Sequence, residues 1–407
     1  MSRPRLVSYG IGLPAAAGVW IAGAWALWRS KVPDDLRRPH LDPAALFTPH
    51  QLHQAERFEL FLRWSNLLSE LVVLVVLALY AWGGERLARE SAAGRIGTGM
   101  LLGMLGLGIL WFTQVPFGLA ELWWERRHDL VEVGYVDWLL SYWLGLAGEF
   151  GFICLALLIV MVFAGPLRGR WWIAGAPAFV ALYAVFAWSS PYLIPDLRPL
   201  QDPELRAAAD RFARAQGIDP VPVKVEDVSA FTRAPNAEAT GTGDSRRIIL
   251  WSTLLDGRFE EKEVEVVLAH ELGHQSRNHI LKSIGWYALF AVPGTFLIAL
   301  ATRRRGSLHE ARAVPLGLFV FVVLSLASQP IFGYITRHME AEADWMALET
   351  TKDPQAAREL FKHFTTVALS DPAPPRWLEF LGDSHPSTLE RIEMAEAWRA
   401  RRAGPHP

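Results

Sequence analysis

Stretches of uncharged, mostly apolar residues recur along this sequence and constrain its fold more than any other feature. The plainest of them cover residues 96–120, 171–195, 283–302 and 313–336. A helix of about 20 apolar residues is long enough to cross the hydrocarbon core of a bilayer. Each stretch therefore predicts a transmembrane helix, and the chain is expected to be an integral membrane protein.

Three further stretches are apolar but less uniform. Residues 64–84 and 139–164 each contain one acid, Glu70 and Glu149. Residues 8–28 follow the basic start "MSRPR" and are compatible with a signal peptide or with a retained anchor, but their length and tryptophans favour the anchor. The sequence thus predicts a mainly α-helical, polytopic membrane protein with about seven transmembrane helices.

Charge and cysteine content exclude some partners and leave other questions open. The 407 residues carry a formal net charge of −2, whereas a nucleic-acid-binding protein usually shows a basic patch or stripe. No nucleic acid partner is therefore expected. Lys and Arg are not distributed unevenly enough between alternate loops to orient the protein by the positive-inside rule. The single cysteine, Cys154, excludes an intrachain disulfide and leaves the redox compartment unconstrained.

Two polar segments divide the second half of the chain. Five expected helices, within residues 1–195, precede the first polar segment, 196–282. A transmembrane hairpin at 283–336 separates it from the second polar segment, 337–407. Because two crossings return the chain to the face that it left, both polar segments lie on the same side of the bilayer. We expect them to fold together as one small α+β domain.

The first polar segment shows both helical and extended patterns. Residues 202–218 repeat apolar side chains at helical spacing, and residues 221–228 alternate valine with other residues as a strand does. Residues 236–251 are typical of two strands joined through a glycine-containing turn. From Glu260 the pattern is helical again and leads into the sequence "HELGH".

This "HELGH" sequence, residues 270–274, suits a zinc hydrolase. Residues four apart share one face of an α-helix, so His270 and His274 can bind the same metal ion. Zinc lowers the pKa of bound water toward about 7, and Glu271 can accept the proton without binding the metal. The alternative is an amphipathic helix on which both histidines are ordinary polar residues.

A catalytic zinc ion needs a third protein ligand, and the sequence "RHMEAEAD" in the second polar segment offers one. Glu340 can complete the set of ligands for one zinc ion. Asp344, four residues later, can orient a ligand histidine through a hydrogen bond, and Asn278 is a further candidate for that role. Glu342 points to another face of the helix and is the weaker ligand candidate. On charge alone these acids would form a solvated face, and only the upstream motif favours ligands.

Five segments in a fixed order resemble the type I CAAX prenyl endopeptidases, which are membrane zinc metallopeptidases of the gluzincin kind. The segments are "LDPAALFTPHQLHQAERF", "RAPNAEATGTGDSRRIILWSTLL", "HELGH", "RHMEAEAD" and "SHPSTLERI". The heat-shock membrane protease is a shorter relative with the same catalytic motifs. The resemblance covers nearly the whole chain and implies about seven helices around an intramembrane chamber, with the zinc domain near one end.

The resemblance implies further site residues. The three expected zinc ligands and Glu271 as general base would keep the roles given above. His385 would stabilise the oxyanion of the tetrahedral intermediate and Arg391 would be an active-site arginine, although His385 would otherwise be taken for a surface residue. Asn236 and Ala237 would lie on a short edge strand that binds an extended peptide as an added strand. An asparagine in "APNA" is also typical of an ordinary turn.

Two positions depart from the family pattern, and the roles of two acidic residues stay open. Ser252 stands where the family has Asp, and Glu238 where an aromatic residue is common, so both bear on substrate preference more than on catalysis. Glu70 and Glu149 would line the implied chamber, or else be buried, hydrogen-bonded structural acids. Because Glu70 lies near the start of its window, an error in that boundary would also explain it.

The predicted function is a membrane-embedded zinc endopeptidase acting on membrane-associated proteins or peptides. The composition suggests a bacterial source, so membrane-protein quality control in the cell membrane is favoured over cleavage of prenylated substrates. The resemblance implies a cytoplasmic zinc domain. Oligomeric state is left open. The alternative is a non-catalytic zinc-binding scaffold, a pseudoprotease, which has no reason to retain Glu271. A transporter would need charges paired along several helices, and a site-2 type protease needs an acid in a late helix that 283–302 and 313–336 lack.

Overall fold

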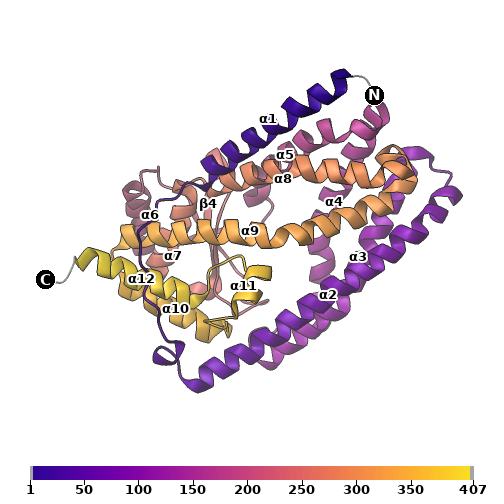
Figure 1. Ribbon diagram of the computed structural model, residues 1–407. Helices are drawn as coiled ribbons and strands as arrows, with labels where there is room; N and C mark the ends of the chain where they lie inside the picture. Colours follow the sequence, from indigo (N-terminus) through magenta and orange to yellow (C-terminus); the bar gives the residue numbers. More distant parts are fainter. Residues whose placement is uncertain (1–2, 404–407) are drawn as a thin grey trace.

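The computed structural model describes residues 3–403, with side chains for all of these except residues 3–13, 15, 90, 142–147 and 149. Glu149 and its expected role therefore lie outside the described residues. The fold is mainly α-helical, with one small four-stranded sheet beside the longest helices (Figure 1).

Among the described residues, six helices are long and apolar enough to cross a bilayer. They are α2 (Pro49–Glu90), α3 (Gly94–Arg127), α4 (Tyr135–Leu167), α5 (Trp172–Ser189), α8 (His279–Thr302) and α9 (Val314–Thr351), and they confirm six of the predicted windows. The seventh window falls in α1 (Arg3–Trp28), whose described apolar part, Ala16–Trp28, is shorter than a full crossing. A total of seven crossings therefore stays a prediction.

Helix α9 is the central element of the molecule. It contacts α2, α3 and α8 in the membrane part and runs on without a break to pack against the polar domain (Figure 1). At 38 residues it is about 57 Å long at 1.5 Å per residue, roughly twice what a bilayer core requires. The last membrane helix thus continues into the second polar segment.

The membrane part has its own apolar core, and its outer surface is apolar too. Leu102, Met161, Trp171, Ala299 and Val314 are buried together between α3, α4, α8, α9 and the turn before α5. Outward-facing side chains such as those on α2 and α5 are large and apolar, including Trp82 at 81% exposure and Val185 at 61%. A surface of this kind suits contact with lipid, since no water is available there to satisfy polar groups.

The polar domain is built from both polar segments around one shared core. Its helices are α6 (Pro203–Ala215), α7 (Glu261–Ser276), α10 (Pro354–Ala368), α11 (Arg376–Gly382) and α12 (Thr388–Ala403). Buried residues from α6, α7, α9, α10 and α12 belong to a single cluster. The expectation that the two segments fold together agrees with this packing.

The sheet has the strand order β1-β2-β4-β3. Its strands are β1 (Arg198–Pro199), β2 (Val223–Glu226), β3 (Ala237–Thr240) and β4 (Arg247–Trp251). β2 pairs with β4 in parallel, whereas β3 pairs with β4 antiparallel, so the expected hairpin is present and β3 forms one edge of the sheet. Val223 and Val225 of β2 and Ile248 and Leu250 of β4 turn one face of the sheet toward the core, and Ile249, on the other face of β4, is buried as well.

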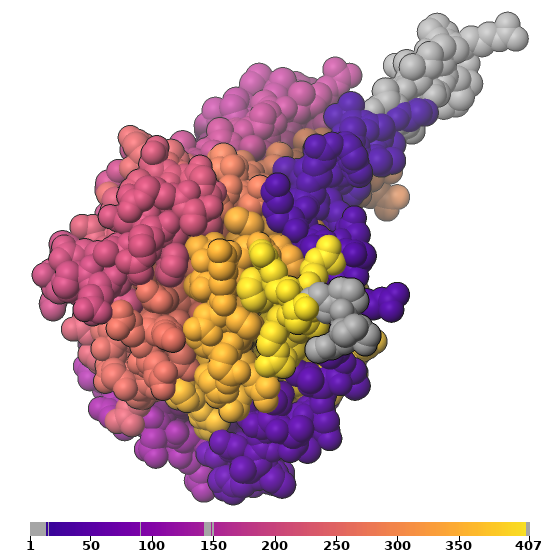
Figure 2. All heavy atoms as spheres, turned by 90° about the vertical axis from the view of Figure 1, so that its left-hand side faces the viewer, coloured from indigo at the N-terminus to yellow at the C-terminus, as the bar shows by residue number. Residues whose placement is uncertain are grey.

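The loop that follows α1 also belongs to the polar domain. Its Asp35 pairs with Arg401 of α12 at 3.1 Å, and the N–H of Leu41 donates to Glu393 at 2.9 Å. Figure 2 shows this part of the chain beside the C-terminal helix on the surface of the domain. Residues from both ends of the chain therefore help to cover the polar core.

Candidate metal centre

His270, His274 and Glu340 lie together between α7 and α9, as the sequence predicted for zinc ligands. The Nε2 atoms of the two histidines are 3.0 Å apart. The Glu340 carboxylate is 3.2 Å from His270 Nε2 and 3.4 Å from His274 Nε2. His270 and Glu340 are buried, and His274 is partly buried. Three ligand atoms of the kinds that bind transition metals thus face one another in a small, largely dry volume.

The close packing of α7 against α9 brings these side chains together. Gly273 lies between the two histidines, and a Cβ atom there would stand 3.2 Å from the backbone of Ala343 on α9. Any side chain at Gly273 would push the two helices apart. At its start, α7 is fixed by a capping box in which Glu260 and Glu263 satisfy each other's backbone N–H groups.

Asp344 and Arg391 support His270 through its Nδ1 atom, which does not face Glu340. Asp344 Oδ1 accepts a hydrogen bond from His270 Nδ1 at 2.8 Å, which leaves Nε2 of the same ring facing Glu340. Arg391, on α12, donates to both oxygens of Asp344 at 2.8 and 2.6 Å and stacks on Phe361 at 4.2 Å. Burial alone would lower the pKa of the Arg391 guanidinium, but the Asp344 carboxylate outweighs burial and raises it.

The contacts of Arg391 indicate a more limited role than that of the expected active-site arginine. Its guanidinium donates hydrogen bonds to Asp344, and its side chain is only 13% exposed. Within the described residues it therefore acts on the metal centre through Asp344 and His270. Direct contact with a substrate stays a prediction for this residue.

Glu271 is next to a ligand histidine in the sequence, and His385 is next to Glu340 in space. Glu271 follows His270 on α7 and is 7% exposed. His385 lies in the loop between α11 and α12, with its Nε2 3.7 Å from the Glu340 carboxylate and its Nδ1 3.0 Å from the Ser384 hydroxyl. The His385 side chain is 62% exposed, so a bound peptide could reach it.

Asn236 and Ala237 lie at the start of the edge strand. The carbonyl of Asn236 accepts a hydrogen bond from Trp251 at 3.0 Å. Because pairing alternates along an antiparallel strand, the backbone groups of Ala237 and Ala239 point to the open edge. Gln275 of α7 donates to the Thr240 carbonyl at 3.1 Å and so fixes β3 to the helix that carries the histidines.

Glu238 on this strand lies in a negatively charged environment. Partial removal from water raises the pKa of its carboxyl, and the nearby carboxylates of Glu226 and Glu271 raise it further. Glu238 is therefore within electrostatic range of the metal centre. Ser252, the other departure from the family pattern, bonds to Asp227 and to the N–H of Val228 and so holds the loop after β2.

The expectation that Asn278 orients a ligand histidine is not matched by its position. Asn278 adopts the left-handed conformation, with φ 55°, at the turn between α7 and α8, a conformation that asparagine tolerates better than most residues. Within the described residues its side chain has no hydrogen bond to either histidine. His279, the next residue, makes that contact with His274 at 3.0 Å. The position of His279, five residues after His274, did not indicate this contact in the sequence.

Glu70 lines a cavity of about 440 Å³ between α2, α9 and α11, which also reaches Asp383 and Ser384 next to His385. Its side chain therefore faces protein rather than lipid. This position agrees with the expectation for an acid within a membrane helix.

An apolar bundle that carries a His-His-Glu cluster between α7 and the end of α9 has the arrangement expected of a membrane metallopeptidase. The sequence of residues 199–399 matches peptidase family M48. The chain is 28% identical to the metalloprotease YhfN of Bacillus subtilis over 274 residues, and 26% identical to a CAAX prenyl protease 1 homolog of Oryza sativa over 211 residues. These matches cover 64% and 49% of this chain, and 63% and 48% of the two relatives, which is less than two thirds of either.

The crystal structure of Ste24p from S. mikatae shares the fold, with a TM-score of 0.70 over 94% of this chain and 97% of that one, at 18% identity. These findings confirm the resemblance that the sequence motifs indicated, to CAAX protease-like proteins of peptidase family M48. A family of metalloproteases implies a bound metal.

Proposed function

We propose that this protein is a zinc endopeptidase that hydrolyses peptide bonds of membrane-associated proteins or peptides. The observation that carries the proposal is the convergence of His270, His274 and Glu340 on one small volume. One oxygen of Glu340 is buried without a hydrogen-bond partner among the described residues. A buried carboxylate oxygen in that state costs free energy unless a cation or a proton satisfies it.

The spacing of the three groups fits zinc. Nitrogen and oxygen ligands bind zinc at about 2.0–2.1 Å, so two of them at a tetrahedral angle lie about 3.3 Å apart. The two Nε2 atoms are 3.0 Å apart, Glu340 Oε2 is 3.2 Å from His270 Nε2, and Glu340 Oε1 is 3.4 Å from His274 Nε2. Three protein ligands of this kind leave one position free, as in catalytic rather than structural zinc sites.

Glu271 and His385 supply the proton transfer and the charge stabilisation that peptide hydrolysis needs. Zinc, when bound, contributes Lewis acidity that makes water more acidic and polarises a carbonyl. Glu271 accepts the proton of the attacking water and delivers it to the leaving amine. His385 donates from Nε2 to the carbonyl oxygen as negative charge develops there. The Ser384 hydroxyl, 3.0 Å from Nδ1, favours that tautomer by donating to Nδ1.

The substrate binds as an extended segment along β3. Ala237 and Ala239 offer backbone N–H and C=O groups at the open edge, so a peptide adds as a further strand and needs no particular side chains. Asn236 lies at the start of that edge. Glu238 favours substrates with a basic residue near the cleaved bond, because its carboxylate and those of Glu226 and Glu271 make this region negative.

The expected substrates are membrane proteins under quality control. Six apolar helices long enough to cross a bilayer support a membrane location, and the relatives named above include a metalloprotease and a CAAX prenyl protease homolog. We further propose a bacterial cell membrane as the location, with the polar domain in the cytoplasm. Seven crossings around an intramembrane chamber would complete the arrangement.

The test combines metal analysis with a search for substrates. Purified full-length protein is expected to contain about one zinc ion per chain. Cells producing Glu271→Gln are expected to accumulate membrane proteins that wild-type cells degrade, in a quantitative comparison of their membrane proteomes. Glu261→Gln, on the exposed first turn of the same helix, is the matched control and should behave as wild type. Wild-type protein that binds no zinc, or identical proteomes for wild type and Glu271→Gln, would refute the proposal.

A further inference from the structure

The second ligand histidine, His274, is supported by side chains that the metal centre itself does not include. Its Nε2 faces His270 and Glu340, while its Nδ1 is 3.0 Å from Nδ1 of His279 at the start of α8. The other nitrogen of His279, Nε2, is 3.0 Å from Glu342 Oε2 on α9. Three side chains from three helices thus form a series that ends on a carboxylate.

The series allows only one arrangement of protons when Nε2 of His274 is a metal ligand. A neutral imidazole that binds metal through Nε2 carries its proton on Nδ1, and His274 then donates to His279 Nδ1. His279 must therefore carry its own proton on Nε2, from which it donates to Glu342. Each contact has one donor and one acceptor. Partners of this kind fix the tautomer and the orientation of a ligand histidine.

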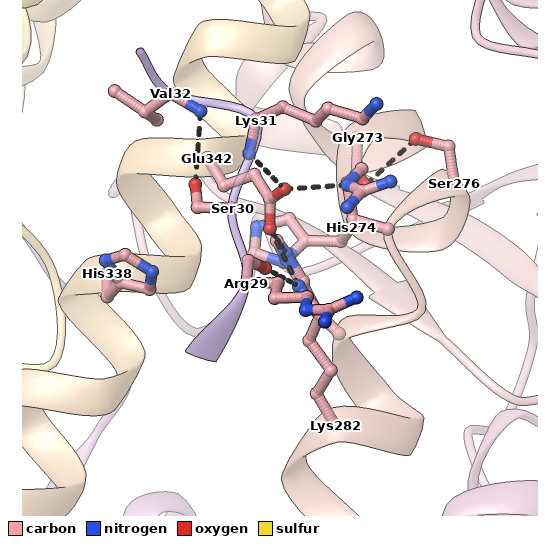
Figure 3. A network of polar contacts seen from close by, with 12 residues as sticks. Arg29, Ser30, Lys31, Val32, Gly273, His274, Ser276, Lys282, His338 and Glu342 are labelled. Carbon is pink, nitrogen blue, oxygen red and sulfur yellow. Dashed lines mark hydrogen bonds and ion pairs between the residues drawn. The ribbon is translucent and has the colours of Figure 1, made fainter. Parts of the chain in front are cut away.

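Glu342 is held in place by four donors, as Figure 3 shows. Oε1 accepts from Arg277 Nε at 2.7 Å and from the backbone N–H of Lys31 at 2.8 Å. Oε2 accepts from His279 at 3.0 Å and from Lys282 Nζ at 2.8 Å. The Glu342 side chain is 1% exposed. Two cations already face one carboxylate here, so further positive charge on His279 would be unfavourable, and the neutral ring is the form that the series requires.

The segment after α1 is part of this cluster. Besides the N–H of Lys31, the carbonyl of Arg29 accepts from Lys282 at 3.0 Å, and the carbonyl of Trp28 accepts from His338 at 2.9 Å. The Trp28 ring also stacks on His338, with 3.9 Å between ring centroids. The Lys31 side chain runs away from the carboxylate in Figure 3, so only its backbone is involved. Residues 28–32 therefore form one side of the pocket that holds Glu342.

We propose that His279 and Glu342 are positioning residues for the zinc ligand His274, and that the backbone of residues 28–32 keeps Glu342 in position. This inference rests on the proposed zinc function. It gives His274 a support that mirrors the one Asp344 and Arg391 give His270. It also makes the affinity for zinc depend on a loop at the beginning of the chain, far in sequence from the motif.

His279→Ala and His279→Asn in the full-length detergent-purified protein test the first half. Zinc affinity is measured by competition with a chelator series, and melting temperature is measured with zinc and with excess chelator. His279→Ala should weaken zinc binding about 10–100-fold and reduce the zinc-induced rise in melting temperature. His279→Asn retains an oxygen near the place of Nδ1 and should recover part of the loss. Because Asn also fills more of the space than Ala does, His279→Leu is the control: it fills the space without an acceptor and should not recover the loss.

Lys31→Pro and Lys31→Ala test the second half and decide the matter if His279→Ala does not fold. Proline removes the N–H that Glu342 accepts, whereas alanine keeps it. Lys31→Pro should lower zinc affinity by about threefold to tenfold, which is less than the full value of a hydrogen bond to a charged group because Lys31 acts on zinc only through Glu342 and His279, and Lys31→Ala should match wild type. Wild-type zinc affinity in His279→Ala, a zinc affinity in His279→Asn no higher than in His279→Ala or His279→Leu, or equal affinities for the two Lys31 variants would overturn the inference. Absence of zinc from wild type would instead refute the proposed function.

Discussion

Asp344→Asn is expected to weaken zinc binding while leaving the fold in place. The carboxylate of Asp344 accepts three hydrogen bonds, one from His270 at 2.8 Å and two from Arg391 at 2.8 and 2.6 Å. An asparagine amide has one acceptor oxygen and one NH2 group. With its oxygen toward His270, the NH2 group faces the Nε–H of Arg391, so one donor opposes another.

The magnitude follows from the loss of a buried, charge-assisted contact. A hydrogen bond to a charged group contributes about 1.5–3 kcal/mol, and about 1.4 kcal/mol corresponds to a factor of ten in affinity. The affinity for zinc should therefore fall about 10–100-fold, the usual result of removing a partner of a ligand histidine. Asp344→Ala removes all three contacts and should fall at the upper end of that range or beyond it.

A double-mutant cycle with Arg391→Ala checks the reasoning. Arg391→Ala alone leaves the Asp344 carboxylate buried without its cation, which should cost about 3–5 kcal/mol in the free energy of unfolding. Adding Asp344→Ala removes that unpaired charge, so the double variant should be less destabilised than the sum of the two single variants. Zinc affinity is measured by chelator competition, and unfolding is measured on metal-free protein. Additive unfolding energies, or wild-type zinc affinity in Asp344→Asn, would refute the account of this pair.

Other substitutions test the chemistry and one local effect of pH. His270→Ala should lose both zinc and peptide cleavage, whereas Glu271→Gln should retain zinc and lose turnover by several orders of magnitude; metal analysis and a peptide assay on the same samples separate the two. His385→Ala should lower kcat about 10²–10³-fold with little change in KM, the usual effect of losing an oxyanion donor, and an effect on KM alone would contradict that role. Burial and the neighbouring Glu390 carboxylate raise the pKa of Glu379 to about 7. Because this pKa is above that of an unfolded chain, the contribution of Glu379 to stability is full below about pH 4.5. It is lost as the pH rises through about 7, so the protection of α11 amides from hydrogen exchange, relative to the intrinsic exchange rate at each pH, should fall across that window, and Glu379→Gln should abolish this fall.

The sequence was most informative at patterns that have few other structural explanations. Two histidines four apart with a glutamate after the first are rarely explained by packing, and they indicated the metal centre without structural information. Long windows without charge indicated the membrane helices for the same reason, since a charged side chain is costly in hydrocarbon. Both predictions depend on the local sequence, which stays the same whatever fold the rest of the chain adopts.

Residues that act through their neighbours were much harder to predict. Asn278 was expected to orient a histidine, but the turn at φ 55° uses it for its backbone, and His279 makes the contact instead. Glu342 was judged only as a possible metal ligand, whereas it holds His279 from the far side. Neither position has a spacing that distinguishes it from an ordinary helix-surface residue, so only the packing of α7, α8 and α9 reveals what it does.

The sequence by itself determined that this chain enters the membrane and that a helix in its polar part carries a His-Glu-x-x-His site. The sequence also named Glu340, Asp344 and Arg391 as candidates, but only the tertiary structure decided which side chains each of them contacts, and it alone added His279 and the backbone of Lys31 from the loop after α1. The physical reason is that local composition and hydrophobic periodicity reflect interactions within one or two helical turns only. A hydrogen bond between residues more than 300 positions apart exists only once three helices have packed.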